Sequence, residues 1–238
     1  EGPVTGRVFV MVATDDGREP RLQIGRNGTP FFGRDVEGLA PGEFGVIDET
    51  DLGSPVENFS DLPAGDYYVQ AMVNIYTEFR RADGHVVWMH DDQWEGQAFQ
   101  RSPGNLYSDV LRVHLDPSEG FDVELVADNV IPPIPFPEDT EWVKRFRFES
   151  PTLSEFWGAP IYIGATVLLP RDYESSTIPY PVLYRQGHFS TGAPLRFREG
   201  SELYREWISD DFPRMLVVTF QHPTPYFDDS YAVNSVNV

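Results

Sequence analysis

Short apolar runs, several of them alternating with polar residues, mark the first half of the chain. Residues 7–12 are almost all apolar, residues 67–73 are rich in aromatic and β-branched side chains, and residues 109–126 alternate on either side of a turn. Alternation with a period of two is typical of strands that bury one face. No stretch before residue 130 keeps a period of 3.6 residues over three helical turns. The pattern predicts an all-β domain over residues 1–131, with an antiparallel sandwich as its expected form.

A cluster of prolines follows this region. Residues 132–137 read Pro-Pro-Ile-Pro-Phe-Pro, and four prolines in six residues suit neither a helix nor a central strand. They favour an extended polyproline II connector. We therefore predict a linker at residues 132–140, with a domain boundary in it.

The pattern changes after the linker. Four strands and one short amphipathic helix are predicted, at residues 142–148, 161–169, 180–184, 199–208 (the helix) and 214–220. The last strand is almost continuously apolar, the type that is buried on both faces of a parallel sheet. This order of elements predicts the start of an α/β domain over residues 141–238. Because a doubly wound sheet needs helices on both faces, we expect an incomplete domain and a chain that is a fragment or one piece of a cleaved protein.

The chain is strongly acidic, which excludes some partners. It carries 38 acidic and 18 basic residues, for a formal charge of −20 and an isoelectric point near 4.4. Nucleic acids and anionic membrane surfaces are bound through lysine and arginine, so neither is an expected partner. Without cysteine, disulfides, thiol nucleophiles and zinc–thiolate sites are excluded. No apolar run approaches the length of about 18 residues that a transmembrane helix needs.

The composition also bears on location. An acid excess with a single lysine, Lys144, is typical of extracellular or high-salt settings, and also of GC-rich genomes. The sequence starts at Glu1, just ahead of the first predicted strand, as a processed mature chain does. We expect a secreted or periplasmic protein.

None of the common catalytic signatures occurs. There is no G-x-S-x-G elbow, phosphate-binding loop, dinucleotide fingerprint, H-E-x-x-H helix or EF-hand loop. His114 alternates in a predicted strand, where a structural role is expected. His85 and His90 lie close to Asp91 and Asp92, and such a group can ligate a metal, but solvated loop residues are the simpler interpretation. We predict no metal site and no cofactor, while an adventitious calcium ion at an acidic pair stays open.

Aromatic residues form a second candidate set, for stacking on sugar rings. Strand alternation alone is expected to place half of them in the core, so carbohydrate binding stays an alternative to packing. The set comprises Tyr67, Tyr68, Tyr76, Trp88, Trp94, Phe99 and Tyr107.

The strongest chemical signal lies in the second part. Gln186-Gly187-His188 directly follows the strand at 180–184, in a loop at the carboxyl edge of the sheet, where open α/β sheets place their ligands. Together with Ala-Thr-Val-Leu-Leu-Pro-Arg-Asp-Tyr (165–173) and Tyr-Pro-Val-Leu-Tyr (180–184), this loop resembles the start of an esterase-D-like α/β-hydrolase. In that family a strand ending in Leu-Pro and a Tyr-Pro-Val-Leu-Tyr strand precede a His-Gly oxyanion loop. Here the usual His-Gly is Gln186-Gly187, and histidine comes one place later.

The resemblance covers residues 145–238 and includes a second loop. Residues 229–235 (Asp-Ser-Tyr-Ala-Val-Asn-Ser) are similar to the family's S-(W/F)-Y-x-N loop near the active site. The resemblance implies a three-layer α/β-hydrolase domain. It makes Gly187, His188, Tyr231 and Asn234 candidates for the oxyanion and substrate loops, with the backbone N–H of His188 as the first oxyanion donor. In the family the nucleophile elbow and the other triad residues follow downstream, so no catalytic residue is predicted in this chain.

Two functions follow from these observations. In the first, the chain is the N-terminal portion of a serine esterase-like hydrolase that acts on carboxyl esters, carbohydrate-linked esters among them. This portion is not catalytic by itself, and a C-terminal fragment or a second chain completes the hydrolase. In the second, the chain is a non-catalytic carbohydrate- or protein-binding β-sandwich protein with a degenerate hydrolase segment.

Overall fold

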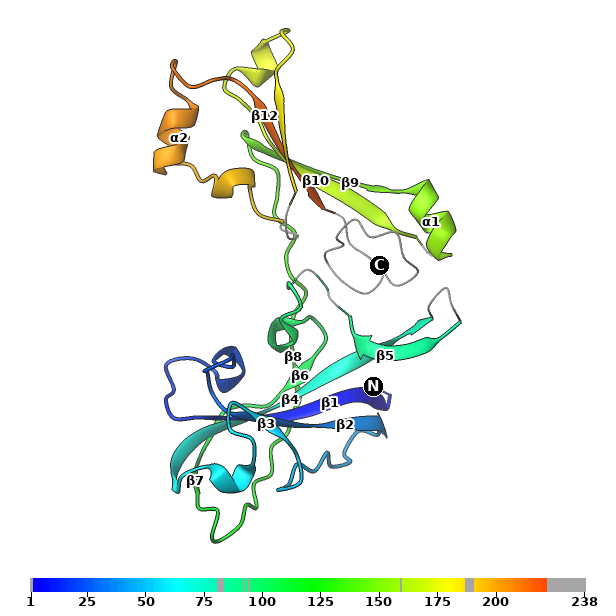
Figure 1. Cartoon of the computed structure of the whole chain (residues 1–238), viewed down its shortest axis with the longest axis vertical. Coiled ribbons are helices and arrows are strands. Elements are labelled where there is room, and N and C mark those ends of the chain that lie inside the picture. Colours follow the sequence, from blue (N-terminus) through cyan, green and yellow to red (C-terminus); the bar gives the residue numbers. More distant parts are fainter. Residues whose placement is uncertain are drawn as a thin grey trace. The chain divides into compact units, whose positions relative to one another are not determined.

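The computed structural model describes residues 2–80, 84–91, 93, 95–158, 160–186 and 191–221 (Figure 1). The chain divides into two compact units, Glu1–Ile134 and Pro135–Val238. The division falls inside the proline cluster at residues 132–137. Each unit is built around a sheet of its own.

The first unit contains, in its described part, an antiparallel sheet of eight strands. The strands are β1 (Val4–Ala13), β2 (Phe31–Leu39), β3 (Gly53–Ser54), β4 (Gly65–Arg80), β5 (Val86–His90), β6 (Leu106–Tyr107), β7 (Leu111–Leu115) and β8 (Asn129–Val130). Their order is β3-β2-β1-β4-β6-β8, and β5 and β7 also pair with β4. The connections contain three short 3₁₀ turns, η1 (Pro20–Leu22), η2 (Phe59–Asp61) and η3 (Phe99–Arg101).

The long strand β4 organises this sheet. Its 16 residues are rich in aromatic and β-branched side chains, which favour strands. Along one edge β4 pairs with β1 over residues 68–75. Along the other edge β7, β6 and β5 follow one another, opposite residues 65–69, 72–73 and 76–80 of β4. One strand therefore connects most of the unit.

Strand alternation places apolar side chains on both faces of this sheet. Val12 and Phe32 belong to one buried cluster, and Phe9 and Met72, which face each other across β1 and β4, belong to another. Segments outside the strands cover these clusters: Phe59 of η2 stacks on Phe32 with 3.9 Å between the ring centres. The all-β, antiparallel character predicted for residues 1–131 is compatible with this unit, whose connected sheet carries an apolar cluster on each face.

The two alternating segments at residues 109–126, which favour a pair of strands around a turn, form strands only in part. The first segment forms β7, which pairs with β4, and a bridge between Asp116 and Gly120 closes the turn. Residues 121–128 are not a strand, and Phe121 and Val123 remain 38% and 37% exposed. The alternating pattern of residues 121–126 therefore predicted a strand, but in the structure this segment pairs with no neighbouring strand.

A fully buried polar side chain, Gln70, lies on the face of the sheet that carries the Phe9–Met72 cluster. Gln70 of β4, opposite Met11, is 1% exposed. Its Oε1 accepts from the backbone N–H of Arg21 at 3.1 Å. Its Nε2 donates to the carbonyl of Ser108 at 2.9 Å and to the carboxylate of Glu19 at 3.0 Å. Because this buried amide is hydrogen-bonded at both of its polar atoms, it connects β4 to η1 and to the loop after β6.

The sheet of the second unit has four strands in the order β11-β12-β10-β9. Its elements are β9 (Val143–Glu149), α1 (Pro151–Trp157), β10 (Tyr162–Leu168), η4 (Tyr173–Ser175), β11 (Val182–Arg185), η5 (Pro194–Arg196), α2 (Glu202–Trp207) and β12 (Leu216–Gln221). The pairs β9–β10 and β10–β12 are antiparallel, and β11–β12 is parallel.

The three-layer α/β-hydrolase domain expected from residue 141 onward is wrong for the described residues. They contain two α-helices, of seven and six residues, and one parallel pair of strands. Because β9 and β10 are antiparallel neighbours joined by α1, they need no crossover helix. The apolar run at 214–220, which resembled a buried parallel strand, lies mostly in β12 of a small mixed sheet. Within the described residues this sheet has no helical layer on each face. No helix in the described part of the chain is long and apolar enough to span a membrane.

One face of this sheet is covered and the other is open within the described residues. Trp207 of α2 is 3% exposed, packs in a cluster with Leu168 and Val217, and donates its Nε1–H to the carbonyl of Leu169 at 2.8 Å. By strand alternation, a set of exposed aromatic side chains lies on the opposite face. These are Phe146, Phe148, Tyr184 and Phe220.

Candidate functional site

The loop residues suggested by the hydrolase resemblance lie outside the described residues. They are Gly187, His188, Tyr231 and Asn234. The two strands that precede them in the sequence are described: β11 and β12 are parallel and in register along four residue pairs. Both strands therefore end at the same edge of the sheet. The roles of these four residues stay predictions.

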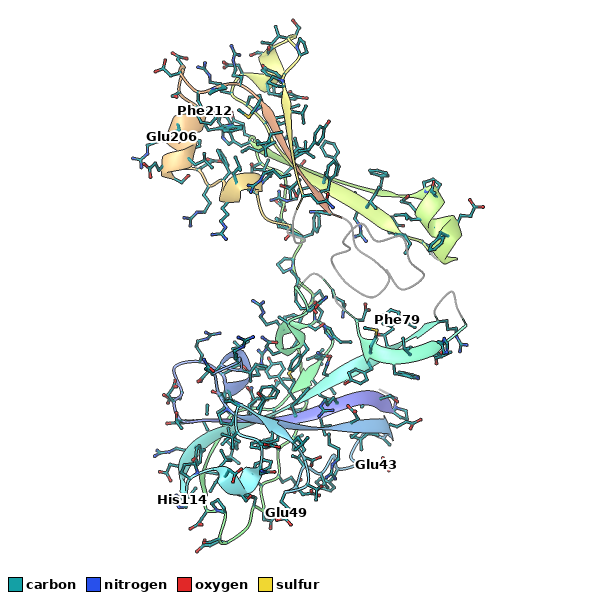
Figure 2. All side chains as sticks on the ribbon, in the orientation of Figure 1. Glu43, Glu49, Phe79, His114, Glu206 and Phe212 are labelled. Carbon is teal, nitrogen blue, oxygen red and sulfur yellow. The ribbon has the colours of Figure 1, made fainter. Side chains whose placement is uncertain are left out.

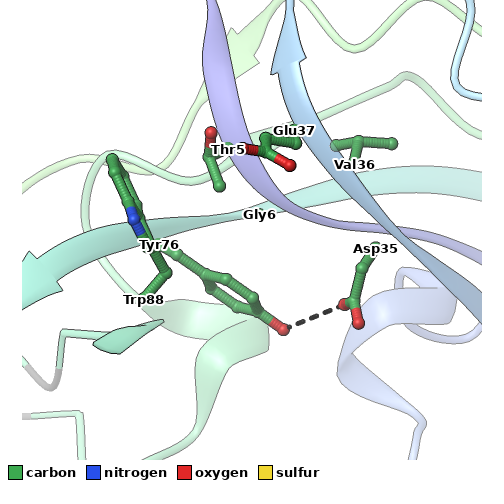
Figure 3. Close-up of a pocket in the computed structure, with 7 residues that line it drawn as sticks. All are labelled: Thr5, Gly6, Asp35, Val36, Glu37, Tyr76 and Trp88. Carbon is green, nitrogen blue, oxygen red and sulfur yellow. Dashed lines mark hydrogen bonds between the residues drawn. The ribbon is translucent and has the colours of Figure 1, made fainter. Parts of the chain in front are cut away.

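Residues of the first unit border an open hollow where β1, β2, β4 and β5 come together (Figure 3). Its volume is about 400 Å³, which is in the range of sites for small molecules. The lining residues are Thr5, Gly6, Asp35, Val36, Glu37, Tyr76 and Trp88. The hollow combines two aromatic rings with two carboxylates and a hydroxyl group.

A β-bulge in β2 shapes one wall of the hollow. Opposite residues 4–6 of β1, β2 holds one residue more between its paired positions 36 and 39. Gly38 lies in this segment with a φ of +63°, in the left-handed region, and its N–H donates to the hydroxyl of Thr5 at 3.1 Å. Bulges bend a strand and change the direction of its side chains. This one lies directly beside Glu37.

Gly6 is required by a close approach of two strands. A Cβ at this position would lie 2.2 Å from the carbonyl oxygen of Asn74 on β4. Because no real side chain fits at such a distance, glycine alone lets β1 and β4 pair here. The lining residues of the two strands are thereby held at a fixed separation.

The aromatic and acidic groups meet at Tyr76 (Figure 3). Its hydroxyl donates to Oδ1 of Asp35 at 3.4 Å, and Nη1 of Arg7 donates to the same oxygen at 3.0 Å. Burial raises the pKa of Tyr76, and the negative charge of Asp35 raises it further, so the phenol keeps its proton. Trp88 lies beside Tyr76 and is 49% exposed. Its indole ring is therefore available to a ligand.

Two buried side-chain amides lie near Tyr76: Asn74, two residues before it on β4, and Asn105, directly before β6. Asn74 and Asn105 are 5% and 3% exposed. Asn105 accepts from the backbone N–H of Ile75 at 2.9 Å, and its Nδ2 donates to the carbonyl of Phe99 at 2.9 Å. These backbone partners fix its orientation, so the same Nδ2 donates to Oδ1 of Asn74 at 3.0 Å. The amide oxygen of Asn74 is thus directed toward β5.

His90 of β5 connects this amide pair to a buried carboxylate. Its Nδ1 lies 3.0 Å from Oδ1 of Asn74, and its Nε2 lies 2.6 Å from Oε1 of Glu95. Since the oxygen of Asn74 only accepts, Nδ1 carries the donated proton. Burial by itself raises the pKa of Glu95, but hydrogen bonds from His90 and from the backbone N–H of Gln93 outweigh burial, and the pKa is lowered. This network anchors β5, and with it Trp88, to β4.

The histidines differ from the sequence-based expectation in one case. His90 is not a solvated loop residue, because it lies in β5 and its side chain is 18% exposed. His114 lies in β7, in the strand expected for it, and its Nδ1 is 2.9 Å from Oδ1 of Asp66 (Figure 2). Hydrogen bonds from His114 and Arg112 lower the pKa of Asp66. No group of three metal-ligating side chains is present in the part of the chain that the structure describes.

The aromatic set proposed for sugar stacking divides as follows. Tyr76 and Trp88 line the hollow. Tyr67 is buried in the core, and Phe99 and Tyr107 pack against the cluster that contains Met72. The guanidinium carbon of Arg112 lies over the ring of Tyr68, 6.0 Å from the ring centre. Trp94 lies outside the described residues.

Sequence reasoning missed Thr5, Asp35 and Glu37. They belong to no motif, and only the pairing of β2 with β1 brings them to Tyr76. One local signal was present: a glycine inside a strand often marks a bulge, and Gly38 directly follows Glu37.

Comparison with known proteins gives no match for this chain. No family model, no curated protein and no solved structure matches it. The resemblance to esterase-D-like hydrolases therefore rests on the quoted motifs and stays a prediction.

Proposed function

We propose that the first unit binds saccharides, and that the hollow between β1, β2, β4 and β5 is the binding site. The observation that carries this proposal is the half-exposed indole of Trp88 beside Tyr76, in a hollow that also contains two carboxylates. A sugar ring has a face of C–H groups and a rim of hydroxyls. Aromatic side chains pack on such an apolar face, and polar groups around them determine which ligand fits.

The polar groups of the hollow suit the hydroxyls of a sugar. Carboxylates accept hydrogen bonds at both oxygens, and the hydroxyls of Thr5 and Tyr76 donate as well as accept. Arg7 and Tyr76 already hold Asp35 in place, by contacts of 3.0 and 3.4 Å to one oxygen. A group oriented before the ligand arrives loses less conformational freedom on binding. Among the described residues the contacts of Asp35 are made by Oδ1, so Oδ2 can accept from a ligand hydroxyl.

The proposal is tested by calorimetric titration of the purified chain with oligosaccharides of glucose, xylose, mannose, glucosamine and N-acetylglucosamine. We expect at least one of them to bind. Trp88→Ala should weaken that binding by about tenfold or more, because it removes the apolar surface on which the sugar face is buried, and a loss of about 1.4 kcal/mol is tenfold in affinity.

Phe44→Ala is the matched control for this substitution. Phe44 belongs to the same unit, is 70% exposed and does not line the hollow. Its replacement should leave the dissociation constant unchanged. Binding of every saccharide by Trp88→Ala at the affinity of the unchanged chain would refute the proposed site, and absence of binding across the panel would refute the proposed function.

Ester hydrolysis remains a second proposal, for the second unit. The observation that favours it is the parallel pair β11–β12, since Gly187 and Tyr231 follow these two strands in the sequence. This proposal concerns the chemistry of the loops and does not require three layers. Because no serine has the G-x-S-x-G frame, the chain alone should not turn over p-nitrophenyl acetate. Turnover that a fluorophosphonate abolishes would reveal a serine nucleophile and contradict this expectation.

A further inference from the structure

We infer that the hollow selects amino sugars, which carry a free protonated amine, over neutral and N-acetylated sugars. This inference rests on the proposed saccharide site and adds the chemical class of its ligand. It depends on Glu37, which lines the hollow together with Tyr76 and Trp88.

The two carboxylates of the hollow differ in their partners. Asp35 forms an ion pair with Arg7 and accepts from Tyr76. For Glu37, an exposed residue, no cation and no hydrogen-bond donor engages the side chain among the described residues. The hollow therefore contains two negative charges and one compensating positive charge. A cationic group on the ligand would complete the balance.

The aromatic rings favour a cation in the same place. An ammonium group is attracted to the face of tryptophan and tyrosine rings, and a carboxylate forms a stronger hydrogen bond with a charged donor than with a neutral one. Trp88 and Tyr76 supply the ring faces, and Glu37 supplies the carboxylate. An acetamido group carries no charge and gains neither contribution. An acidic sugar is disfavoured, because it would add a third negative charge to a chain whose formal charge is already −20.

The bulge in β2 explains how the carboxylate is placed. Gly38, with its φ of +63°, changes the course of β2 immediately after Glu37, and its N–H is held by the hydroxyl of Thr5. In a regular strand, alternation would direct residues 35 and 37 to the same face at a regular spacing. The extra residue alters that spacing at the point where Thr5 and Trp88 also line the hollow.

The test compares two tetrasaccharides by calorimetric titration, β-1,4-linked glucosamine and its fully N-acetylated counterpart. At about pH 6 the amine carries its proton, and at low ionic strength of about 0.05 M its charge is little screened. We expect the amino form to bind about tenfold more tightly than the acetylated form. Glu37→Gln should reduce this preference to less than about twofold, and salt at about 0.5 M should reduce it in the unchanged chain.

Glu49→Gln is the matched control, because it removes the same charge from an exposed position of the same unit that does not line the hollow (Figure 2). It should keep the full preference, which separates a local contact from the overall charge of the chain. Glu37→Asp keeps the charge on a shorter side chain and should keep part of the preference. An effect of misfolding would instead weaken both ligands in both Glu37 variants.

The outcomes distinguish this inference from the proposed function. Equal affinity for the two tetrasaccharides, or a preference that survives in Glu37→Gln, would overturn the selection of amino sugars while saccharide binding stands. Binding of neither tetrasaccharide, with binding of another saccharide in the panel, would also overturn it. Absence of any binding would overturn the proposed function, and this inference with it.

Discussion

Replacing Gln70 by methionine tests how the core of the first unit is held together. Methionine keeps the length of the side chain and nearly its volume, but it makes none of the three hydrogen bonds of the amide. The backbone N–H of Arg21 and the carbonyl of Ser108 then lose the partners that Gln70 provides at 3.1 and 2.9 Å. Since Arg21 is 8% and Ser108 is 2% exposed, water does not readily replace the lost partner.

The size of the effect follows from these two backbone groups. Each unsatisfied buried group costs about 1–3 kcal/mol, so the pair costs about 2–6 kcal/mol. Burial of a thioether in place of an amide returns about 1 kcal/mol. Glu19 adds little to the loss, because it keeps the contact of 2.7 Å with Nε of Arg21. We expect the free energy of unfolding of the first unit to fall by about 3 kcal/mol.

Hydrogen exchange of the backbone amides in β1 and β4 measures this quantity for the first unit by itself. Their protection should fall by a factor of about 150 in Gln70→Met. Glu49→Met is the control, because Glu49 is an exposed residue of the same unit and its replacement should change stability by less than about 0.5 kcal/mol. A loss below about 1 kcal/mol in Gln70→Met would refute the reasoning, since the orphaned backbone groups would then have no measurable cost.

Two further predictions concern the strands that line the hollow. Gly6→Ala should destabilise the first unit by about 2–3 kcal/mol, because the new Cβ would lie 2.2 Å from the carbonyl oxygen of Asn74. Gly25→Ala should be neutral in the same unfolding experiment, because a Cβ at this position would have no atom within 4 Å. Although burial raises the pKa of Glu95, hydrogen bonds from His90 and the backbone lower it below the ordinary value of 4.5. The ionised carboxylate therefore stabilises the folded state above pH 4.5. This stabilisation is lost as the pH falls through the lower pKa of the folded state. The difference in unfolding free energy between the unchanged chain and Glu95→Gln should therefore shrink on acidification below 4.5, and a constant difference down to about pH 3 would contradict this.

Local patterns predicted several elements well. The apolar runs at 7–12 and 67–73 lie in β1 and β4, and the runs at 161–169 and 214–220 nearly coincide with β10 and β12. In each of these runs the side chains that are buried lie close together in the sequence. The strand can therefore be recognised from its own residues, without knowledge of the strand it pairs with. β2 was not predicted as a strand. Its sequence, Phe-Phe-Gly-Arg-Asp-Val-Glu-Gly-Leu, contains three charged residues and two glycines, and glycine, aspartate and glutamate are uncommon in strands.

Long-range pairing limited the prediction of the fold class and the site. Residues 142–148 and 161–169 were predicted as strands of an α/β domain, but they pair as antiparallel neighbours, so their connection needs no crossover helix. Trp88 and Tyr76 could be named from the sequence as aromatic candidates. Their carboxylate partners could not, because Asp35 and Glu37 reach them only through the register and bulge of β2.

The central claim, that the hollow binds a saccharide, is tested most directly by following N–H signals in ¹H–¹⁵N NMR spectra during titration with the saccharides. We expect the indole N–H of Trp88 and the amides of residues 5–6 and 35–37 to shift with one saturable curve, since these groups line the hollow. The same titration of Trp88→Ala should give much smaller shifts in residues 5–6 and 35–37. Saturable shifts confined to other parts of the chain, or an unchanged indole signal of Trp88 with every saccharide, would contradict the claim.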